Sequence, residues 1–358
     1  MSRPSRALID LEALRYNYLL ARRKHGGRAL AVLKANAYGH GALRCAHALK
    51  DIADGFAVAF VEEALALRHG GITAPILVLE GPFAVSELKD VQEQGLWMVV
   101  HHEAQLRMIE LNADPRPLNI WLKADSGMRR AGFSLADFPA AHARLLSSGK
   151  VGELTLMTHF ARADEPESSA TEDQITAFDA ATAHLPGERS LCNSAGVLGW
   201  AGARRDWARP GILLYGADPM PGAPSGLKPV MTLKSEVFAV RDLQQGDALG
   251  YGGGFVADKP LRVGLVAVGY ADGYPRTAPA GTPVGVDGQL SRIVGRVSMD
   301  MLTVDLSGLP GAGLGSSVEL WGSQISVNDV ASRVGTVSYE LLCNVKRVPL
   351  VYSPVSSA

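Results

Sequence analysis

Short apolar runs alternate with amphipathic segments over the first 215 residues of the chain, and this alternation constrains the fold more than any other feature. The runs are almost continuously hydrophobic, as expected for parallel strands that are covered on both faces. Eight can be recognised: Ala29–Leu33, Gly55–Phe60, Ile76–Leu79, Trp97–Val100, Leu118–Leu122, Leu154–Thr158, Ser190–Cys192 and a weaker one that ends near Arg209.

Helical patterns separate these runs. They are Gly41–Lys50, Glu62–His69, Ser86–Gln94, Glu103–Leu111, Leu135–Ser148, Thr171–His184 and Ser194–Ala201, and an earlier one, Leu11–Arg23, follows Asp10 as a plausible N-cap. Eight strands that alternate with helices predict an α/β fold built on a (β/α)8 barrel. A doubly wound open sheet has the same local pattern, and periodicity does not distinguish the two.

The alternation of strand-like and helical segments ends after Gly216. A Pro- and Gly-rich segment, Ala217–Gly226, has the composition of a linker. The short strand-like runs that follow are separated by turn residues and predict an all-β domain. These runs are Met231–Val240, Val263–Val268, Thr282–Val286, Arg292–Val294, Met301–Val304 and Ser317–Leu320. We therefore expect a barrel over residues 1–225 and a C-terminal β domain over residues 226–358.

Composition excludes several classes of function. The formal net charge is −1, so the chain has no general attraction for nucleic acid or for an anionic membrane. Its three cysteines form no close pair, and no metal-binding spacing is present, so we expect neither a disulfide framework nor a metal. The N-terminus lacks the apolar core of a signal peptide, and no run reaches the ~20 apolar residues that span a bilayer. A cytoplasmic location is the expectation.

Polar side chains follow five of the predicted strands. Lys34, Lys123, His159, Asn193 and Arg209 come after or at the end of the first, fifth, sixth, seventh and eighth strands. Any one of them is more often a solvated residue at a strand exit, but barrel enzymes place their active sites at these strand ends. Barrels also bind phosphate with the loops after strands 7 and 8, which here are residues 193–196 and 209–212.

The stretch Ala31–Gly41, AVLKANAYGHG, closely resembles the pyridoxal-phosphate attachment motif of alanine racemases, and the degradative type of Gram-negative bacteria is the nearest. The resemblance continues in family order along the chain. It covers Trp121–Arg130, Thr158–Phe160, Asn193–Ser194, Arg209–Gly216, Gly250–Gly252, Gly269–Tyr274, Arg296–Asp300 and Ser338–Glu340. Two departures are the glycines that follow Gly252, at 253 and 254, and Leu350 where arginine is common.

The resemblance implies an isomerase of fold type III that interconverts L- and D-alanine through an external aldimine of pyridoxal 5'-phosphate. It makes Lys34 the Schiff-base lysine and the base for the D-enantiomer, and Tyr251 the base for the L-enantiomer. A hydrogen-bond chain from Tyr251 through His159 to Arg209 would help the phenol lose its proton. Arg209 would also face the pyridine nitrogen, where a guanidinium can donate a hydrogen bond without protonating the ring.

The resemblance also assigns binding roles. Arg130 would contact the phenolic oxygen of the cofactor and the substrate carboxylate, and Lys123 matches a position that is carbamylated in many relatives. The cofactor-binding set is Lys34, Tyr38, His159, Asn193, Ser194, Arg209, Gly211, Ile212 and Tyr339. Met299, Tyr270 and Asp300 would line the substrate side. Because Tyr251, Tyr270, Met299 and Asp300 come from the partner subunit in this family, the resemblance implies an obligate homodimer with shared active sites.

Alternatives remain within the same chemistry. A barrel decarboxylase with the same cofactor would place an acidic residue at the ring nitrogen, where this chain has Arg209, and a non-catalytic cofactor carrier would lack the β domain. Related racemases accept serine, lysine or arginine, so the breadth of specificity stays open. The sequence also leaves open whether the enzyme supplies or consumes the D-alanine of the bacterial cell wall.

Overall fold

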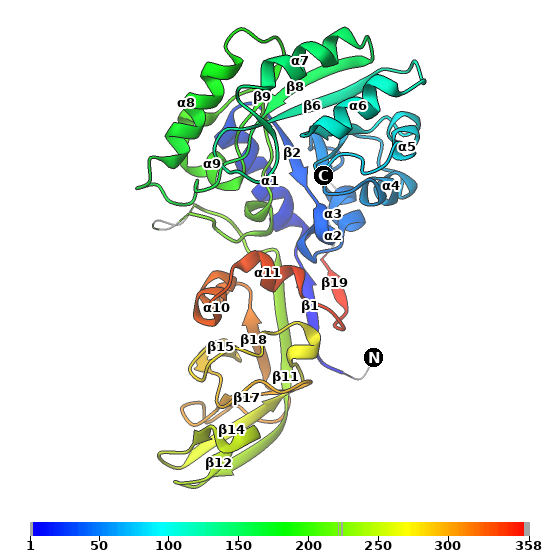
Figure 1. The fold of residues 1–358 in the computed structure, drawn as a ribbon. Coiled ribbons are helices and arrows are strands. Elements are labelled where there is room, and N and C mark those ends of the chain that lie inside the picture. The colour runs from blue at the N-terminus through cyan, green and yellow to red at the C-terminus, as the bar shows by residue number, and fades with distance from the viewer. Residues whose placement is uncertain (1–2, 221, 223–224, 354–358) are drawn as a thin grey trace.

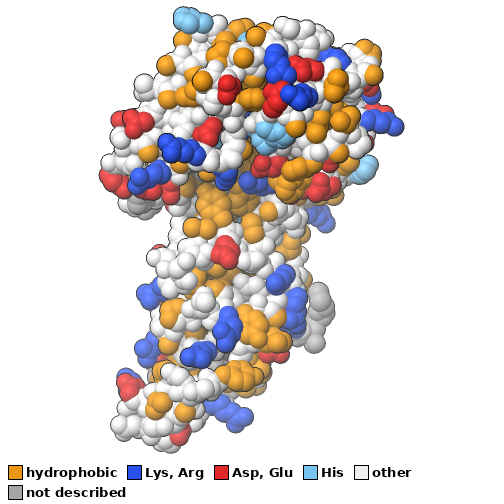
Figure 2. All heavy atoms as spheres, in the orientation of Figure 1, with side chains coloured by type: hydrophobic (Ala, Val, Ile, Leu, Met, Phe, Trp, Pro, Cys, Tyr) orange, Lys and Arg blue, Asp and Glu red, His pale blue; other side chains and the backbone are white. Residues whose placement is uncertain are grey.

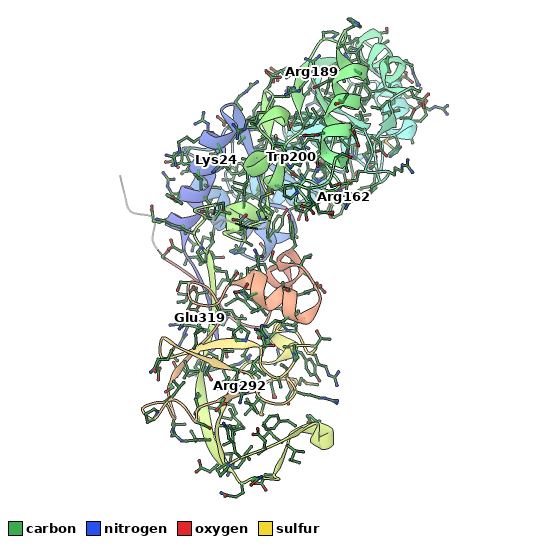
Figure 3. The ribbon with its side chains drawn as sticks, turned by 90° about the vertical axis from the view of Figure 1, so that its left-hand side faces the viewer. Lys24, Arg162, Arg189, Trp200, Arg292 and Glu319 are labelled. Carbon is green, nitrogen blue, oxygen red and sulfur yellow. The ribbon has the colours of Figure 1, made fainter. Side chains whose placement is uncertain are left out.

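The computed structural model describes residues 3–220, 222 and 225–353. The chain forms two parts joined at a narrow waist, a helix-covered barrel and a strand-rich part (Figure 1). A view turned by 90° shows the same division, with Arg189 in the barrel and Arg292 in the strand-rich part (Figure 3). Within the described residues, no helix is both long and apolar enough to cross a membrane.

Eight parallel strands form a closed barrel. They are β2 (Arg28–Val32), β3 (Gly55–Val58), β4 (Ile76–Val78), β5 (Trp97–Val100), β6 (Leu118–Asp125), β8 (Val151–Met157), β9 (Glu188–Ser190) and β10 (Trp207–Ala208). Their order is β5-β4-β3-β2-β10-β9-β8-β6, and β5 pairs in turn with β6. This last pairing closes the ring and excludes the open doubly wound sheet. The predicted barrel is therefore confirmed.

Helices cover the outside of the barrel (Figure 1). They are α1 (Leu11–His25), α3 (Ala42–Leu49), α4 (Val61–His69), α5 (Glu87–Glu93), α6 (Glu103–Leu111), α7 (Phe138–Ser147), α8 (Ala170–Thr182) and α9 (Ser194–Gly199). Shorter elements are the left-handed segment α2 (Lys34–Tyr38), the two-residue strand β7 (Phe133–Ser134) and the 3-10 turns η1 (Ala201–Ala203) and η2 (Ile212–Tyr215). Asp10 is the N-cap of α1, since its carboxylate accepts a hydrogen bond from Ala13 N at 2.9 Å.

Three tryptophans fill the barrel interior near the amino ends of the strands. Trp97 begins β5 and Trp207 begins β10, yet their ring centroids lie 5.5 Å apart, and both rings lie about 6 Å from that of Trp121 in β6. Because β5 and β10 are not neighbours in the sheet, rings that meet in this way must meet inside the barrel. With its lower half packed, the barrel interior is left open at the carboxyl ends of the strands, where barrel enzymes form their pockets.

The second part is mostly strands. It contains β11 (Met231–Leu243), β12 (Ala248–Leu249), β13 (Phe255–Val256), β14 (Leu261–Val266), β15 (Pro283–Val286), β16 (Gln289–Arg292), β17 (Leu302–Asp305), β18 (Ser317–Trp321) and β19 (Leu350–Tyr352), with the turns η3 (Tyr251–Gly253) and η4 (Tyr270–Asp272). It also holds two helices, α10 (Val327–Val334) and α11 (Ser338–Cys343), which the expectation of strands alone did not include.

The N-terminal strand β1 (Arg6–Ile9) joins this second sheet. It pairs antiparallel with β11 and parallel with β19, so the chain starts in the strand-rich part before it enters the barrel. The predicted division at residues 225 and 226 stays a prediction, and residues 221, 223 and 224 of the predicted linker lie outside the described residues. Several strand ends differ from the expectation by one to three residues. Strand β6 continues to Asp125, so Lys123 lies within the strand, and β9 ends at Ser190 instead of Cys192.

We expect Asn17 to be a strong tether between helix α1 and the segment that leaves the barrel. This fully buried side chain donates to Leu214 O and Lys228 O and accepts from Lys228 N, at 2.7–3.1 Å. Asn17→Ala leaves these backbone groups without a partner and should lower the free energy of unfolding by about 2–3 kcal/mol in urea titration. The half-buried Asn112, whose amide donates to Gln92 Oε1, provides the control, with an expected loss near 1 kcal/mol for Asn112→Ala. Equal losses for the two variants would contradict the assignment.

Candidate active site

One pocket of about 390 Å³ opens at the carboxyl ends of the barrel strands, and it gathers most of the predicted site residues. The predicted residues that line it are Lys34, Tyr38, Lys123, Arg130, His159, Asn193, Ser194, Arg209, Gly211, Ile212 and Tyr339. Because Tyr339 belongs to α11, the pocket lies where the barrel meets the strand-rich part. On the face seen in Figure 2, hydrophobic side chains gather at this waist, with lysine and arginine side chains beside them.

Lys34 stands at the start of an unusual turn. The four residues after it, Ala35 to Tyr38, all have φ between 51° and 55°, so the chain makes one left-handed turn without a glycine. Each such residue costs roughly 1–2 kcal/mol relative to a right-handed turn. Strain of this kind persists only where the surroundings hold it, and it is common at functional sites.

Two polar side chains hold the beginning of this turn. The carboxylate of Glu63 accepts a hydrogen bond from Ala35 N at 2.7 Å and another from Ala59 N at 2.7 Å. The side chain of Asn36 accepts from Ala42 N at 2.9 Å, which ties the turn to the first residue of α3. The backbone that follows Lys34 is therefore fixed, and the side chain of Lys34 lines the pocket.

The loops after β9 and β10 meet at one end of the pocket. Ser194 Oγ accepts hydrogen bonds from Gly211 N at 2.9 Å and from Leu213 N at 3.3 Å, while Asn193 caps α9 through Gly196 N. A Cβ at position 211 would lie 2.5 Å from the Tyr38 hydroxyl, so only glycine permits this approach. The amide of Ile212 opens η2 and has no acceptor within that turn. Hydroxyls and backbone amides that converge in this way suit a phosphate group.

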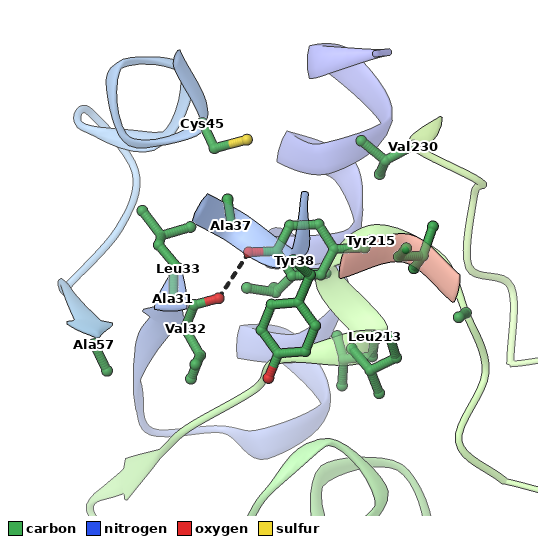
Figure 4. Packing of buried hydrophobic residues seen from close by; sticks show 14 of the residues in the cluster. Ala31, Val32, Leu33, Ala37, Tyr38, Cys45, Ala57, Leu213, Tyr215 and Val230 are labelled. Atoms are coloured by element: carbon green, nitrogen blue, oxygen red, sulfur yellow. Dashed lines mark hydrogen bonds between the residues drawn. The ribbon is translucent and has the colours of Figure 1, made fainter. Parts of the chain in front are cut away.

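Two tyrosines complete this end of the pocket. The ring of Tyr339 lies 5.9 Å from that of Tyr38, and Tyr215 packs on the other side of Tyr38 at 4.8 Å (Figure 4). Burial raises the pKa of the Tyr38 phenol above its ordinary value and raises the pKa of Tyr339 to about 12. Both phenols therefore remain protonated at neutral pH and can donate hydrogen bonds to an anion.

The deep end of the pocket is cationic. Arg209 is 4% exposed and donates to Thr158 O at 2.6 Å and to the carbonyl and hydroxyl of Ser190. Burial lowers the pKa of Arg209 to about 10, so it still carries its charge at neutral pH. Burial and the nearby Arg209 lower the pKa of Lys123 to about 8 and hold that of His159 well below 6.5. The imidazole of His159 is therefore neutral.

Lys123 is the least compensated of these groups. It is 8% exposed, and no hydrogen bond or ion pair joins its amine to another described residue. Glu80 lines the same pocket, and its carboxylate, together with the weaker effect of Asp125, opposes the positive charge near Lys123. A buried amine of this kind needs an anion beside it, which a bound ligand or a chemical modification would provide.

Two residues of the pocket with titratable side chains, Glu80 and Cys343, were missed by sequence reasoning. Glu80 directly follows the predicted run Ile76–Leu79, so the rule that selected Lys34 would have selected it too. Its carbonyl is held by His101 Nε2 and Gln105 Nε2, at 3.1 and 2.8 Å. Cys343 ends α11, a helix that the sequence pattern did not indicate.

The remaining predicted residues do not line this pocket. Tyr251 is 78% exposed in η3, and Met299 is 56% exposed in the loop before β17. The loops that carry Tyr270, Met299 and Asp300 lie side by side, since Tyr270 N donates to Ser298 O and Ala271 N to Met299 O. The structure therefore brings these three together on the strand-rich part, and none of them lines the Lys34 pocket. Nor does Arg209 donate to His159 within the described residues, so that link of the expected chain stays a prediction.

The fold and the pocket define a barrel enzyme of the kind that has a lysine, and hydroxyl and amide groups suited to a phosphate, at the carboxyl ends of its strands. The arrangement fits pyridoxal phosphate: an amine for its aldehyde, a hydroxyl and amide cradle for its phosphate, and cations for its other oxygens.

Comparison with known proteins identifies the family. The model of the alanine racemase N-terminal domain matches residues 9–219, and that of the C-terminal domain matches residues 230–352. An alanine racemase of Azoarcus sp. strain BH72 is 67% identical over 350 residues, which cover 98% of this chain and 99% of the relative. A catabolic alanine racemase of Pseudomonas aeruginosa strain PAO1 is 58% identical over 354 residues, 98% of this chain and 99% of the relative.

Solved structures agree. The biosynthetic alanine racemase of Pseudomonas aeruginosa superimposes with a TM-score of 0.96 at 49% identity, and covers 98% of this chain and all of that one. The alanine racemase of Bartonella henselae, solved with covalently bound pyridoxal phosphate, has a TM-score of 0.90 at 28% identity, over 98% and 99% of the two chains. The chain belongs to the alanine racemase family, and it is a racemase enzyme.

Acidic pH should destabilise the fold through its buried histidines. Burial lowers the pKa of His25 and of His40 from 6.5 to about 4. Below pH 6.5 these histidines become protonated in the unfolded chain but stay neutral in the folded chain. Their contribution to the free energy of unfolding is therefore fully present above pH 6.5 and is lost as the pH falls toward 4. Each histidine should cost on the order of 2 kcal/mol by pH 5, where carboxylates are still ionised. We expect the thermal midpoint to fall from pH 7 to pH 5, and a His25→Gln variant to fall less. A midpoint that rises or stays level would contradict this.

Proposed function

We propose that this chain interconverts L-alanine and D-alanine with pyridoxal phosphate, using Lys34 and Tyr251 as the two bases. The observation that carries the proposal is the Lys34 pocket itself, in which an amine, a phosphate cradle and three further cations converge. The identity to curated alanine racemases over the whole chain supports the substrate. Bound pyridoxal phosphate supplies a conjugated ring that takes up the electrons left when the α-proton is removed.

The residues of the pocket divide this work. Lys34 holds the cofactor and afterwards moves the α-proton at its amine nitrogen, on one face of the substrate. Ser194 Oγ, the amide of Ile212 and the phenols of Tyr38 and Tyr339 hold the phosphate, while Gly211 supports them by donating its amide to Ser194 Oγ and Asn193 caps the helix that carries Ser194. Because these groups come from three different loops and from α11, they orient the cofactor as well as bind it.

Arg130 and Arg209 place positive charge beside the oxygens and the ring nitrogen that the reaction uses. Arg130 contacts the cofactor's phenolic oxygen and the substrate carboxylate, and its planar fork suits two oxygen acceptors. Arg209 donates a hydrogen bond to the ring nitrogen and keeps its own proton, because even the lowered pKa of about 10 leaves it charged. His159 is neutral, as its strongly lowered pKa requires, and can relay a hydrogen bond between Tyr251 and Arg209.

Tyr251 acts from a second copy of the chain. Within one chain the phenol is exposed and does not line the pocket of Lys34. Inversion at a flat carbon needs a proton donor and acceptor on each face. We therefore infer a head-to-tail homodimer in which Tyr251, Tyr270, Met299 and Asp300 complete the partner's pocket. Met299 donates its backbone amide to the substrate carboxylate, and Tyr270 and Asp300 line the entry.

Heterodimers test this division directly. Lys34→Ala and Tyr251→Phe subunits with different tags should each be almost inactive as homodimers, with L-alanine racemisation followed by circular dichroism. A purified heterodimer then has one pocket with both bases and one with neither, so it should recover about half of wild-type activity. A heterodimer of Lys34→Ala with wild type, expected at about half activity, controls for assembly. An inactive mixed heterodimer would rule out shared sites.

L-serine, L-lysine and L-arginine in the same assay define the specificity.

Lys123 is proposed to carry a carbamate. A pKa near 8 leaves a fraction of the amine neutral at pH 7, which reaction with carbon dioxide requires, and the product would replace a buried cation by an anion able to orient Arg130. A ¹³C-bicarbonate NMR experiment on the wild-type protein should show one carbamate signal that is absent from Lys123→Ala. The variant should have at least a tenfold lower kcat/KM for alanine. Absence of the signal from the wild type would refute the modification.

The relatives include proteins described as catabolic and as biosynthetic alanine racemases. We propose that this enzyme works in the cytoplasm on the D-alanine pool of the bacterial cell wall.

A further inference from the structure

His40 is buried completely beside the cofactor pocket but does not line it. It lies in the stretch Ala31–Gly41, two residues after Tyr38, and no step of the proposed reaction uses it. Burial lowers the pKa of its imidazole to about 4, so the ring is neutral at physiological pH. A neutral ring carries one N–H group, and the position of that proton follows from the acceptors around it.

The acceptors lie on one ring nitrogen. His40 Nδ1 is 3.0 Å from Ala37 O and 2.9 Å from Tyr38 O, whereas Nε2 has no hydrogen-bond partner within the described residues. Two carbonyl oxygens can only accept, so the proton must be on Nδ1, which donates to both. These carbonyls belong to the last two residues of the left-handed turn that starts after Lys34. The imidazole is therefore a donor to the end of the turn, as Glu63 is an acceptor at its beginning.

A second ring fixes the imidazole in place. His40 stacks on Tyr215 with ring centroids 4.5 Å apart and an angle of 29° between the planes. The hydroxyl of Tyr215 donates to Val32 O at 2.8 Å, near the end of β2, and its ring also packs against Tyr38 (Figure 4). His40 and Tyr215 together thus link the barrel strand before Lys34 to the turn after it.

The chain around His40 has no room to relax. Gly39 and Gly41 both have positive φ, and a Cβ on Gly39 would lie 2.2 Å from Leu342 O of α11. On Gly41 it would lie 2.0 Å from the hydroxyl of Tyr352. The segment is packed tightly between the barrel and the strand-rich part. Hydrogen bonds to its backbone therefore hold it in its strained conformation. Among these, His40 supplies the side-chain hydrogen bonds to the carbonyls at the end of the turn.

We propose that His40 is a positioning residue for pyridoxal phosphate: its Nδ1–H holds the left-handed turn that directs Lys34 and the Tyr38 hydroxyl into the pocket. The inference rests on the proposed use of this cofactor. Loss of the donor lets the turn move toward a right-handed or extended backbone, which displaces both contacts to the cofactor at once. The consequence is weaker cofactor binding by a protein that still folds.

Two substitutions separate the donor from the bulk of the ring. His40→Asn keeps an N–H group near the place of Nδ1, and His40→Leu fills the space without a donor. His142→Leu is the matched control, because His142 is also buried and bonds through Nε2 to Pro186 O at 3.0 Å, but it lies on α7 and does not line the pocket. The dissociation constant of pyridoxal phosphate is measured by fluorescence titration of each apoprotein, at a temperature where circular dichroism shows it folded.

We expect His40→Leu to weaken cofactor binding by at least about tenfold, His40→Asn by about threefold or less, and His142→Leu not at all, although both leucine variants lower the thermal midpoint. If His40→Leu does not fold, His40→Met replaces it, since methionine also lacks the donor and adapts to irregular space, and it should weaken binding by at least about tenfold.

The inference is wrong if His40→Leu binds the cofactor as the wild type does, if His40→Asn is as weak as His40→Leu, or if His142→Leu weakens binding equally. Wild-type protein that fails to bind pyridoxal phosphate would instead overturn the proposed function. The two failures are therefore distinguishable.

Discussion

The pairing of β5 with β6 is the constraint on which the rest of the structure depends. It closes eight strands into a ring, so that side chains from distant parts of the sequence meet at one rim. Lys34, Lys123 and Arg209 are far apart along the chain, yet all three line one pocket. The tryptophans near the other end of the ring leave that rim as the place where a ligand can enter the barrel. Closure thus creates a site that none of the strands possesses alone.

Closure also concentrates positive charge, and that charge explains the chemistry of the pocket. Arg209 retains its proton at neutral pH because its pKa falls only to about 10. Burial and neighbouring cations lower the pKa of Lys123 to about 8 and that of His159 well below 6.5. The pocket therefore offers a fixed cation, an amine close to its titration point and a neutral imidazole within one small volume. A phosphate, a phenolic oxygen and a carboxylate would each relieve part of this repulsion, so the anionic groups of the proposed cofactor and substrate stabilise the same protein that positions them.

Local and periodic features could be predicted from the sequence, while non-local ones could not. The barrel strands and the Asp10 cap follow from hydrophobic pattern and capping chemistry. Lys34, His159 and Arg209 were identified because they lie at the ends of predicted strands, where barrel enzymes place their active sites. The pairing of β1 with β11 could not be predicted, because register between segments more than 200 residues apart leaves no periodic signal. The left-handed turn was hidden because Ala35 and Ala37 favour ordinary helices, and the contacts that hold it, from Glu63, Asn36 and His40, are made in the folded chain. Helix α11 is six residues long, too short for a hydrophobic period to show.

The position of Tyr251 decides how the proposed reaction can be divided between chains. It stands on a short turn with Gly250 before it and three glycines after it, and most of its ring faces solvent. An exposed tyrosine on a glycine-rich turn contributes little to the stability of its own domain, so packing alone gives no reason for it. The backbone that follows Lys34, in contrast, is strongly constrained, so this residue would hold the proposed cofactor in a fixed position from one side. A reaction that inverts a carbon needs an equally well placed proton donor and acceptor on the opposite face. In the proposed dimer, the glycine-rich turn that carries Tyr251 becomes ordered only when it docks on the partner's barrel.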